Sequence, residues 1–340
     1  MLNSGLVEFP KINKVVLLGG GKVLCELVEF IQFSGLDLTV LISPRHSLET
    51  IDGITLGDFL RRRNVNFQIL ESISVEKLNE VLGNLEASVC LSLGAAWIFS
   101  QKVIREVFSN RLLNSHGTRL PQNRGGGGFS WQVMTSNRFG FTTLHLVDAG
   151  IDTGPIVSQE EFLYPASCRI PADYQEKFNI KNSLFLKSFI SKLIESSVTF
   201  ELRAQSESMS TYWPRLSSEI NSWVDWNLDP ISLERSICAF DDPYPGAKTY
   251  LNAKLVSVKK VALNFEDGQF HPFQSGLVYR TGRDWICVAV SGAGLIIESL
   301  QDESGVDVLG DVHTGDRFNT PGELLTQARE RISYGPTGLK

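Results

Sequence analysis

The sequence predicts an α/β protein in which a Rossmann-like, mostly parallel sheet domain precedes a smaller β-barrel domain. Over the first 160 residues, apolar runs typical of strands alternate with helical patterns, as in a parallel sheet. Beyond a polar stretch that begins near residue 204, short strand-like runs follow one another closely, which favours a small barrel. A chain of 340 residues has room for about two such domains.

The elements of the first domain follow from hydrophobic periodicity. The first strand, Val15–Leu18, leads through Gly19–Gly21 into a helix over Lys22–Phe33. Further strands are expected at Leu38–Ile42, Phe67–Leu70, Ala87–Leu93, Leu112–Asn114 and Phe141–Val147, the last with an antiparallel partner at Pro155–Glu161. Further helices are expected over Val75–Leu82, Lys102–Phe108, Phe129–Thr135 and Lys181–Ser197.

The second domain opens with a helix expected over Ile231–Phe240. Its strand candidates are Ala247–Leu251, Lys254–Leu263, Gly276–Tyr279, Trp285–Val290 and Gly294–Leu300. These patterns predict a first domain over residues 1–203, a linker over 204–213, a barrel over 214–315 and a peripheral tail over 316–340.

The overall composition excludes several classes of protein. The net charge of −6, from 32 Lys+Arg against 38 Asp+Glu, does not favour nucleic acid or an anionic membrane as partner. The sequence has neither a long uncharged apolar run nor a signal-peptide pattern, and its five scattered cysteines form no CxxC pair. We therefore expect a cytoplasmic protein with reduced thiols and no membrane partner.

The glycines after the first strand do not form a dinucleotide-binding motif. A G-x-G-x-x-G motif needs a third glycine where this chain has Leu24, and Asp37 precedes the second strand instead of ending it. A tight turn between strand and helix is sufficient to explain Gly19–Gly21.

Polar residues gather where two predicted strands end. Asn114 and His116 are two residues apart at a carboxyl end, so their side chains point to one side, at the edge where α/β sheets bind ligands. His145 lies on the strand Phe141–Val147, and Asp152 follows in a Gly-rich turn. Imidazole suits proton transfer near neutrality. A histidine that satisfies loop backbone and an Asx-turn aspartate are the structural alternatives.

These segments resemble the N10-formyltetrahydrofolate-dependent formyltransferases. The resemblance rests on Asn114-Ser-His116, on Leu120-Pro121 and Arg124-Gly125, and on the run from His145 to Pro155. Ser92–Phe99 resembles the family's folate-facing loop, and the similarity extends over about Lys14–Phe162. Two-domain members of the family have segments similar to Val224–Trp226 and Arg235–Ala247. This similarity implies the formyltransferase fold with an OB-like C-terminal barrel. It argues against the glycinamide ribonucleotide enzymes, which have a single domain.

The resemblance also implies roles for individual residues. Asn114 would donate to the oxyanion, His116 would carry protons and Asp152 would hold the imidazole, with no metal required. The co-substrate, N10-formyltetrahydrofolate, would contact Leu93, Gly94, Trp97, Ile98, Phe99, Val147 and Gly150. The amine substrate would contact Arg124, Gly125, Gly126 and His145.

Two departures from the family pattern leave the amine acceptor open. Methionyl-tRNA enzymes usually continue Arg-Gly-Ala-Ala-Pro, whereas this chain reads Arg-Gly-Gly-Gly-Gly-Phe-Ser-Trp over 124–131. Trp97 also stands where an aliphatic residue is common. Both changes concern the acceptor or folate pocket and leave the catalytic residues intact.

Three functions compete. The first is formylation of a small biosynthetic amine, such as a nucleotide-linked amino sugar, by a possible homodimer. The second is methionyl-tRNA formylation, and the third is a non-catalytic folate- or nucleotide-binding module. A tRNA enzyme should have a basic second domain. Residues 212–340 instead carry 12 Lys+Arg and 17 Asp+Glu, so we expect no nucleic-acid partner.

Overall fold

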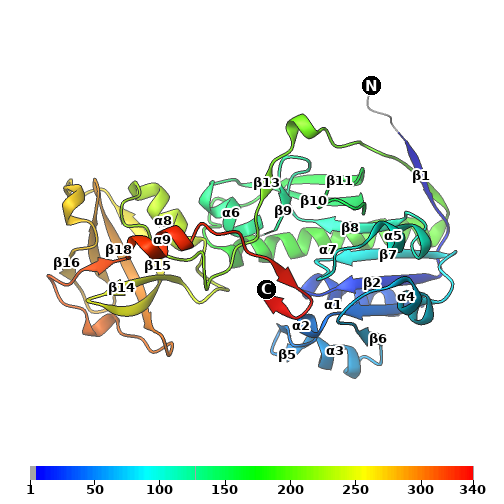
Figure 1. Cartoon of the computed structure of the whole chain (residues 1–340), viewed down its shortest axis with the longest axis horizontal. Coiled ribbons are helices and arrows are strands. Elements are labelled where there is room, and N and C mark those ends of the chain that lie inside the picture. The colour runs from blue at the N-terminus through cyan, green and yellow to red at the C-terminus, as the bar shows by residue number, and fades with distance from the viewer. Residues whose placement is uncertain (1–4, 127, 340) are drawn as a thin grey trace.

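A seven-stranded sheet forms the centre of the first domain (Figure 1). The computed structural model describes residues 5–126 and 128–339. The strand order in this sheet is β11-β10-β8-β7-β2-β3-β6. Its strands are β2 (Lys14–Gly19), β3 (Asp37–Ile42), β6 (Asn66–Ile69), β7 (Ser88–Leu93), β8 (Leu112–His116), β10 (Phe139–Leu146) and β11 (Ile156–Leu163). From β8 to β6 all neighbours are parallel, whereas β10 pairs antiparallel with both β8 and β11. The predicted mostly parallel sheet is confirmed.

Helices cover both faces of this sheet. The helices α1 (Lys22–Phe33), α3 (Leu56–Arg62) and α7 (Pro171–Glu195) contribute to one apolar core, and α4 (Val75–Leu82) and α5 (Gln101–Glu106) contribute to the other. Helix α7 begins at Pro171, earlier than the predicted Lys181. The Asp173 carboxylate accepts from the N–H groups of Arg169 (2.8 Å) and Ile170 (3.2 Å) and so caps the first turn of the helix. The helix start was not predicted because this first turn is too polar to show apolar periodicity.

Several short elements were not predicted. They are α2 (Pro44–Ser47), the hairpin of β4 (Thr50–Ile51) and β5 (Ile54–Thr55), and the antiparallel pair of β1 (Leu6–Phe9) with β12 (Val198–Glu201). The predicted linker also carries structure, because β13 (Tyr212–Trp213) pairs in parallel with β9 (Arg124–Gly125) just before α6 (Gly128–Met134). Short 3₁₀ turns occupy Glu207–Met209, Pro272–Gln274 and Leu309–Asp311.

The second domain is an antiparallel sheet in the order β16-β17-β18-β15-β14-β19, next to α8 (Pro230–Cys238). The strands β14 (Ala247–Leu251), β15 (Lys254–Asn264), β16 (Val278–Thr281), β17 (Ile286–Val290) and β18 (Ala293–Asp302) lie where strands were predicted. A bridge between Leu277 and Arg317 brings the two edge strands together, so the sheet curls on itself. Its OB-like identity stays a prediction.

Residues 316–340 differ from the peripheral tail that was expected. The strand β19 (Phe318–Asn319) belongs to the second sheet, and the Phe318 side chain is buried. After α9 (Gly322–Gln327) the chain runs back to the first domain and forms a hairpin of β20 (Tyr334–Gly335) and β21 (Gly338–Leu339) beside α2 (Figure 1). The composition of this segment does not predict that it packs against the first domain, because its contacts are with residues far away in the sequence.

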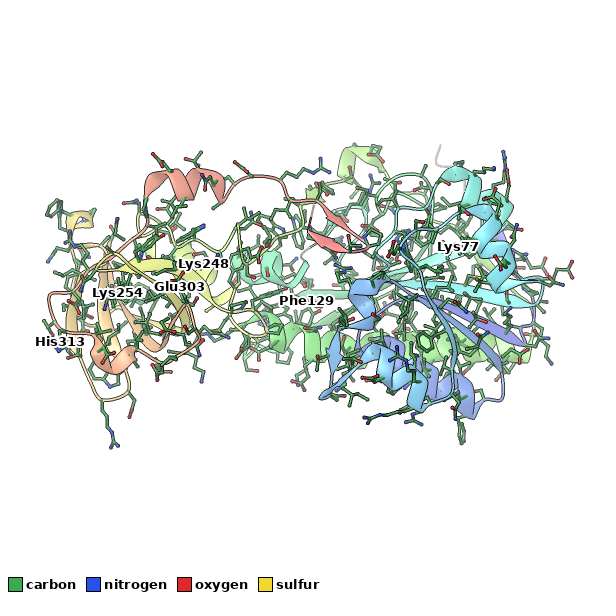
Figure 2. All side chains as sticks on the ribbon, turned by 60° about the horizontal axis from the view of Figure 1, so that its bottom comes forward. Lys77, Phe129, Lys248, Lys254, Glu303 and His313 are labelled. Atoms are coloured by element: carbon green, nitrogen blue, oxygen red, sulfur yellow. The ribbon has the colours of Figure 1, made fainter. Side chains whose placement is uncertain are left out.

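The two domains share one apolar core. Val133, Tyr164 and Tyr174 of the first domain pack in the same cluster as the barrel residues, and Phe129 lies where the two domains meet (Figure 2). The Ala239 carbonyl accepts from the Ser130 hydroxyl at 2.8 Å, which ties α6 to the end of α8. Among the residues described, no helix is long and apolar enough to cross a membrane.

Candidate active site

The pairing of β8 with β10 brings the predicted polar residues together. Asn114 lies opposite His145 in this antiparallel register, and His116 lies opposite Thr143. Side chains of directly opposed residues project from the same face of a sheet. The turn after β10 then brings Asp152 to the same place, so the three predicted catalytic residues and His145 form one cluster.

The Asn114 amide is oriented by two neighbours. Its Nδ2 lies 3.1 Å from His145 Nε2 and donates to Asp152 Oδ1 at 3.3 Å. An ionised carboxylate only accepts hydrogen bonds, so the amide nitrogen, and not its oxygen, must face Asp152. His145 Nδ1 lies 2.9 Å from the Leu146 carbonyl, so the Nδ1–H donates there, and Nε2 lies 3.1 Å from Asn114 Nδ2 and 3.5 Å from Asp152 Oδ1.

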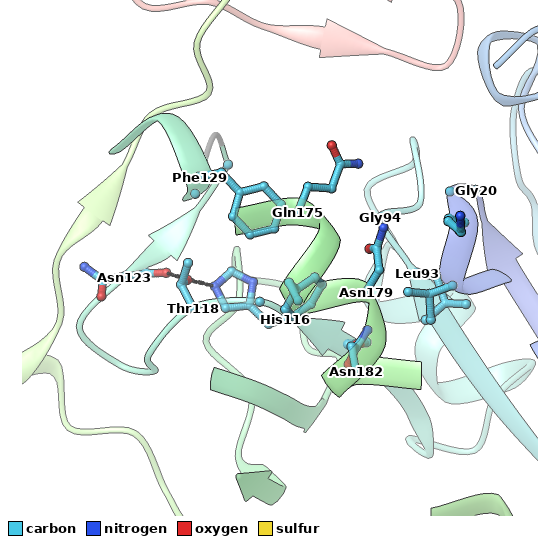
Figure 3. A pocket seen from close by; sticks show the side chains of 18 of the residues that line it. Gly20, Leu93, Gly94, His116, Thr118, Asn123, Phe129, Gln175, Asn179 and Asn182 are labelled. Atoms are coloured by element: carbon cyan, nitrogen blue, oxygen red, sulfur yellow. Dashed lines mark hydrogen bonds between the residues drawn. The ribbon is translucent and has the colours of Figure 1, made fainter. Parts of the chain in front are cut away.

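The two nitrogens of His116 face different partners. Nδ1 is 3.7 Å from Asp152 Oδ2. Nε2 is 2.8 Å from the Asn123 carbonyl oxygen and 2.7 Å from the Thr118 hydroxyl, which itself lies 2.7 Å from that carbonyl (Figure 3). A carbonyl oxygen only accepts, so Nε2 carries a hydrogen that is directed at the Asn123 carbonyl and the Thr118 hydroxyl. Nδ1, which faces Asp152, is then the nitrogen available for proton exchange.

Asp152 is held in its ionised form. Burial alone would raise the pKa of this carboxyl, but the neighbouring His116 and His145 and a hydrogen bond from the Gly125 N–H lower the pKa well below its usual range. The Gly125 bond is 3.0 Å long. The backbone of Asp152 has φ 55°, a left-handed conformation that Asp tolerates better than most residues. The turn thus supplies a fixed negative charge beside both imidazoles.

Two hollows meet at this cluster. The larger, about 560 Å³, is lined by Asn114, His145, Asp152, the loop Gly94–Phe99 and part of the tail. The smaller, about 320 Å³, is lined by Gly20–Lys22, the Gly-rich loop and α7 (Figure 3). His116 lines both hollows, as do Gly94, Ser115, Gly125, Gly126 and Arg215. The His116 imidazole is therefore accessible from two directions.

The residues predicted to bind the folate lie mostly in the larger hollow. Gly94, Trp97, Ile98, Phe99, Val147 and Gly150 line it, whereas Leu93 lines the smaller one. Trp97 is buried, and its indole Nε1 has no hydrogen-bond partner among the described residues. Ile98, by contrast, is 79% exposed. Trp97, Phe99 and Val147 give the larger hollow apolar surface of the kind a heteroaromatic ligand needs.

The residues predicted to bind the amine divide into two groups. Gly125 and Gly126 line both hollows, and Gly125 has φ 102° with its Cβ position only 2.3 Å from the Trp213 carbonyl oxygen, which requires glycine there. Arg124 is directed elsewhere: it is buried, lines neither hollow, and bonds to Gln205 (3.1 Å) and Glu207 (2.8 Å) of the linker. His145 supports Asn114 from within the cluster.

Sequence reasoning missed the polar face of α7. Gln175, Asn179 and Asn182 line the smaller hollow on successive turns of the helix (Figure 3). Asn182 also accepts from the Ser115 hydroxyl at 3.0 Å. Their spacing is helical, but the predicted helix began only at Lys181. Thr118, Asn123 and Gln205 carried no signal in the sequence.

The turn Gly19–Gly21 has its own internal acceptor. The Glu49 carboxylate accepts from the Gly21 N–H at 3.1 Å, at the start of α1, where a nucleotide phosphate would otherwise bind. Burial raises the pKa of Glu49 despite this hydrogen bond. A Cβ on Gly19 would lie 2.1 Å from the Leu93 carbonyl oxygen, which explains that glycine by close packing. Among the residues described, no cluster of three His, Cys, Asp or Glu is arranged to hold a metal ion.

Comparison with known families matches both halves of the chain. The family model described as formyl transferase matches residues 67–174, and the one described as formyl transferase, C-terminal domain, matches residues 217–310. The chain is 27% identical over 194 residues to methionyl-tRNA formyltransferase of Geobacter sulfurreducens, a match that spans 56% of this chain and 57% of that relative. With methionyl-tRNA formyltransferase of Citrifermentans bemidjiense the identity is 26% over 266 residues, or 76% of this chain and 78% of the relative.

A solved structure shares the fold. It is the N-formyltransferase from Helicobacter canadensis in complex with folinic acid and dTDP-3-aminofucose, with a TM-score of 0.63, 18% identity, and coverage of 84% of this chain and 99% of that one. At this level of identity the likeness establishes the fold alone.

Proposed function

The chain belongs to the formyltransferase family, and from this membership we propose that it transfers a formyl group from N10-formyltetrahydrofolate to a primary amine. The observation that carries the proposal is the cluster of Asn114, His116 and Asp152 at the point where the two hollows meet. A two-substrate transfer needs such a meeting point, because the donor and the acceptor must both reach the same proton carrier.

Each residue of the cluster then has one task. A bond forms between the amine nitrogen and the formyl carbon, the bond from that carbon to N10 breaks, and one proton moves from the amine to N10. Asn114 donates to the carbonyl oxygen as negative charge develops on it, using the N–H that lies at the long distance of 3.3 Å from Asp152. His116 takes the proton from the amine and returns it to N10, and Asp152 stabilises the charged imidazole in between.

The larger hollow is the better fit for the folate. It is lined by the loop Gly94–Phe99 and has apolar surface from Trp97, Phe99 and Val147. The Helicobacter canadensis enzyme was crystallised with folinic acid, and the fold likeness makes a folate ligand a reasonable expectation for this chain.

The smaller hollow is the better fit for the acceptor. Gln175, Asn179 and Asn182 offer side-chain amides, and Phe129, Phe178 and Trp213 offer aromatic surface. Amides and aromatic rings suit a polyhydroxylated ring. Arg215 and Lys22, whose Nζ also pairs with Asp52 at 3.1 Å, line the same hollow and would attract phosphate. This combination supports a nucleotide-linked amino sugar as the acceptor.

A second candidate function is formylation of methionyl-tRNA. It is favoured by the sequence similarity to the methionyl-tRNA formyltransferases of Geobacter sulfurreducens and Citrifermentans bemidjiense. The charge of the second domain argues against it, since residues 212–340 have five more acidic than basic residues, whereas phosphate contacts dominate tRNA affinity.

One experiment separates these functions. The protein is incubated with N10-formyltetrahydrofolate and, in parallel, with a panel of nucleotide-linked amino sugars or with initiator methionyl-tRNA, and the products are analysed by mass spectrometry. We expect the mass of one added CO on at least one amino sugar and none on the tRNA. Formylation of the tRNA alone would select the second candidate. Binding of folinic acid without turnover of any amine would leave a non-catalytic module.

A further inference from the structure

The C-terminal tail lies outside both family matches, the second of which ends at residue 310. The tail is nevertheless docked on the folded protein. Asn221 Nδ2 donates to the Ala328 carbonyl at 2.8 Å where the tail begins, and the Arg45 N–H donates to the Pro336 carbonyl at 3.4 Å near its end. Between these points Ile332 is 8% exposed. The segment 328–336 therefore has a defined path over the first domain.

This path places the tail at the active site. Arg331, Ile332, Ser333 and Gly335 all line the larger hollow that also contains Asn114. The red end of the chain crosses the upper part of the close-up view of the neighbouring hollow (Figure 3). The Arg331 guanidinium lies over the Tyr212 ring at 5.5 Å, and Tyr212 belongs to the strand that holds the Gly-rich loop. A favourable cation–π contact thus helps to orient Arg331.

Positive charge from three separate segments lines this hollow. Arg45 comes from α2, Arg215 follows β13, and Arg331 comes from the tail. Arg45 and Arg215 are close enough to act on one group: burial and then these two cations lower the pKa of His46 to about 4. The lining also has two carboxylates, Asp148 and Asp152.

Both carboxylates already have partners. Asp148 accepts from the Gly150 N–H at 3.1 Å and from the Thr153 hydroxyl at 2.5 Å, and Asp152 accepts from Asn114 and Gly125. They belong to the turn after β10, whereas the three arginines come from elsewhere in the chain. Arg45 Nη2 lies 3.2 Å from His46 Nε2, and of the three arginines Arg331 is the exposed one.

We propose that Arg331 of the docked tail binds an anionic group of a ligand bound at the larger hollow. The inference rests on the proposed function, because both ligands of that reaction carry anions: the glutamate carboxylates of the folate in the larger hollow and the phosphates of a nucleotide-linked acceptor in the adjoining smaller hollow. Both sources present oxygen anions that the planar guanidinium binds well. The tail then forms part of the lining of the active site.

The test is the binding of two probes, folinic acid and dTDP, by calorimetry at low and high salt. We expect Arg331→Ala to weaken one probe by about tenfold and to reduce the salt dependence of its binding. Arg331→Lys keeps the charge but not the fork geometry, and should lose less. Arg329→Ala removes an exposed arginine of the same tail that does not line the hollow, and should bind like the unaltered protein.

The probe that weakens identifies the source of the anion, a carboxylate if it is folinic acid and a phosphate if it is dTDP. Unchanged binding of both probes to Arg331→Ala, or an equal loss in Arg329→Ala, overturns the role of Arg331 while the proposed function stands. If the unaltered protein binds neither probe, the proposed function fails and this inference fails with it. Near-ultraviolet circular dichroism of each variant checks that the fold is kept.

Discussion

The centre of the candidate site and its walls are assembled in different ways. The centre consists of Asn114, His116 and His145 on two neighbouring strands, where backbone pairing fixes the side chains, and of Asp152 in the turn that follows. The walls consist of the face of α7 that lines the smaller hollow and of the linker and the tail. The linker and the tail are held by individual contacts, such as the bonds of Arg124 to Gln205 and of Arg45 to Pro336. A paired strand gives geometric precision, whereas docked segments can vary without disturbing it.

The difference predicts a division of labour. Changes at the centre should act on the rate of the chemical step and leave the binding of both substrates largely intact. Changes in the walls should act on binding and on local stability.

The first prediction concerns His116. Replacement by Ala removes the proton carrier, and kcat should fall by about 10²–10⁴-fold. His116→Asn keeps a hydrogen-bonding group but cannot titrate, so it should be about as damaging. The matched control is His313→Ala, an exposed histidine on the barrel (Figure 2), which should leave kcat unchanged. If His116→Asn retained a third or more of the activity, the role of His116 as proton carrier would be rejected.

The second prediction concerns the charge of Asp152. Asp152→Asn keeps a residue that makes Asx-turns but removes the charge beside His116, and kcat should fall by at least about tenfold. Because the folded-state pKa of Asp152 is lowered, the carboxylate is ionised throughout the pH range in which the enzyme is assayed. A plot of the wild-type rate against pH should therefore show no change that reflects protonation of Asp152. Near-normal turnover of Asp152→Asn would identify the aspartate as a turn residue only.

The same variant makes a prediction for stability. A carboxyl whose pKa is lower in the folded than in the unfolded state stabilises the fold above the unfolded value of about 3.9, and this stabilisation is lost as the pH falls further. The difference in unfolding free energy between wild type and Asp152→Asn should thus be constant near neutrality and should shrink below about pH 4. Urea unfolding at several pH values measures it. A difference that grew on acidification would contradict the assigned ionisation of Asp152.

The third prediction concerns the linker. Gln205 Nε2 donates to the carbonyls of Asp152 (2.8 Å) and Gly154 (2.6 Å), so it ties the linker to the catalytic turn. Gln205→Ala should lower the unfolding free energy by about 1 kcal/mol and change kcat only a few-fold. Ser208→Ala, an exposed change in the same segment, serves as the control. A loss of kcat as large as that of Asp152→Asn would show that the linker belongs to the centre.

Sequence reasoning reached the centre more fully than the walls. Asn114, His116 and Asp152 lie in local patterns, at strand ends and in a Gly-rich turn, and local patterns are what one sequence can reveal. The family resemblance implies a substrate contact for Arg124, but its direction is set by Gln205 and Glu207, far along the chain. The tail gave no signal, because its place depends on contacts with α2 and Tyr212.

The most direct test compares two asparagines, one in the centre and one in a wall. Asn114→Ala and Asn179→Ala make the same chemical change, and kcat and KM are measured for each with the amine acceptor that turns over. We expect Asn114→Ala to lower kcat by about 10²–10³-fold with little change in KM, and Asn179→Ala to raise the KM of the acceptor and leave kcat within about twofold. Equal losses of kcat in both variants, or an unchanged kcat in Asn114→Ala, would contradict this expectation.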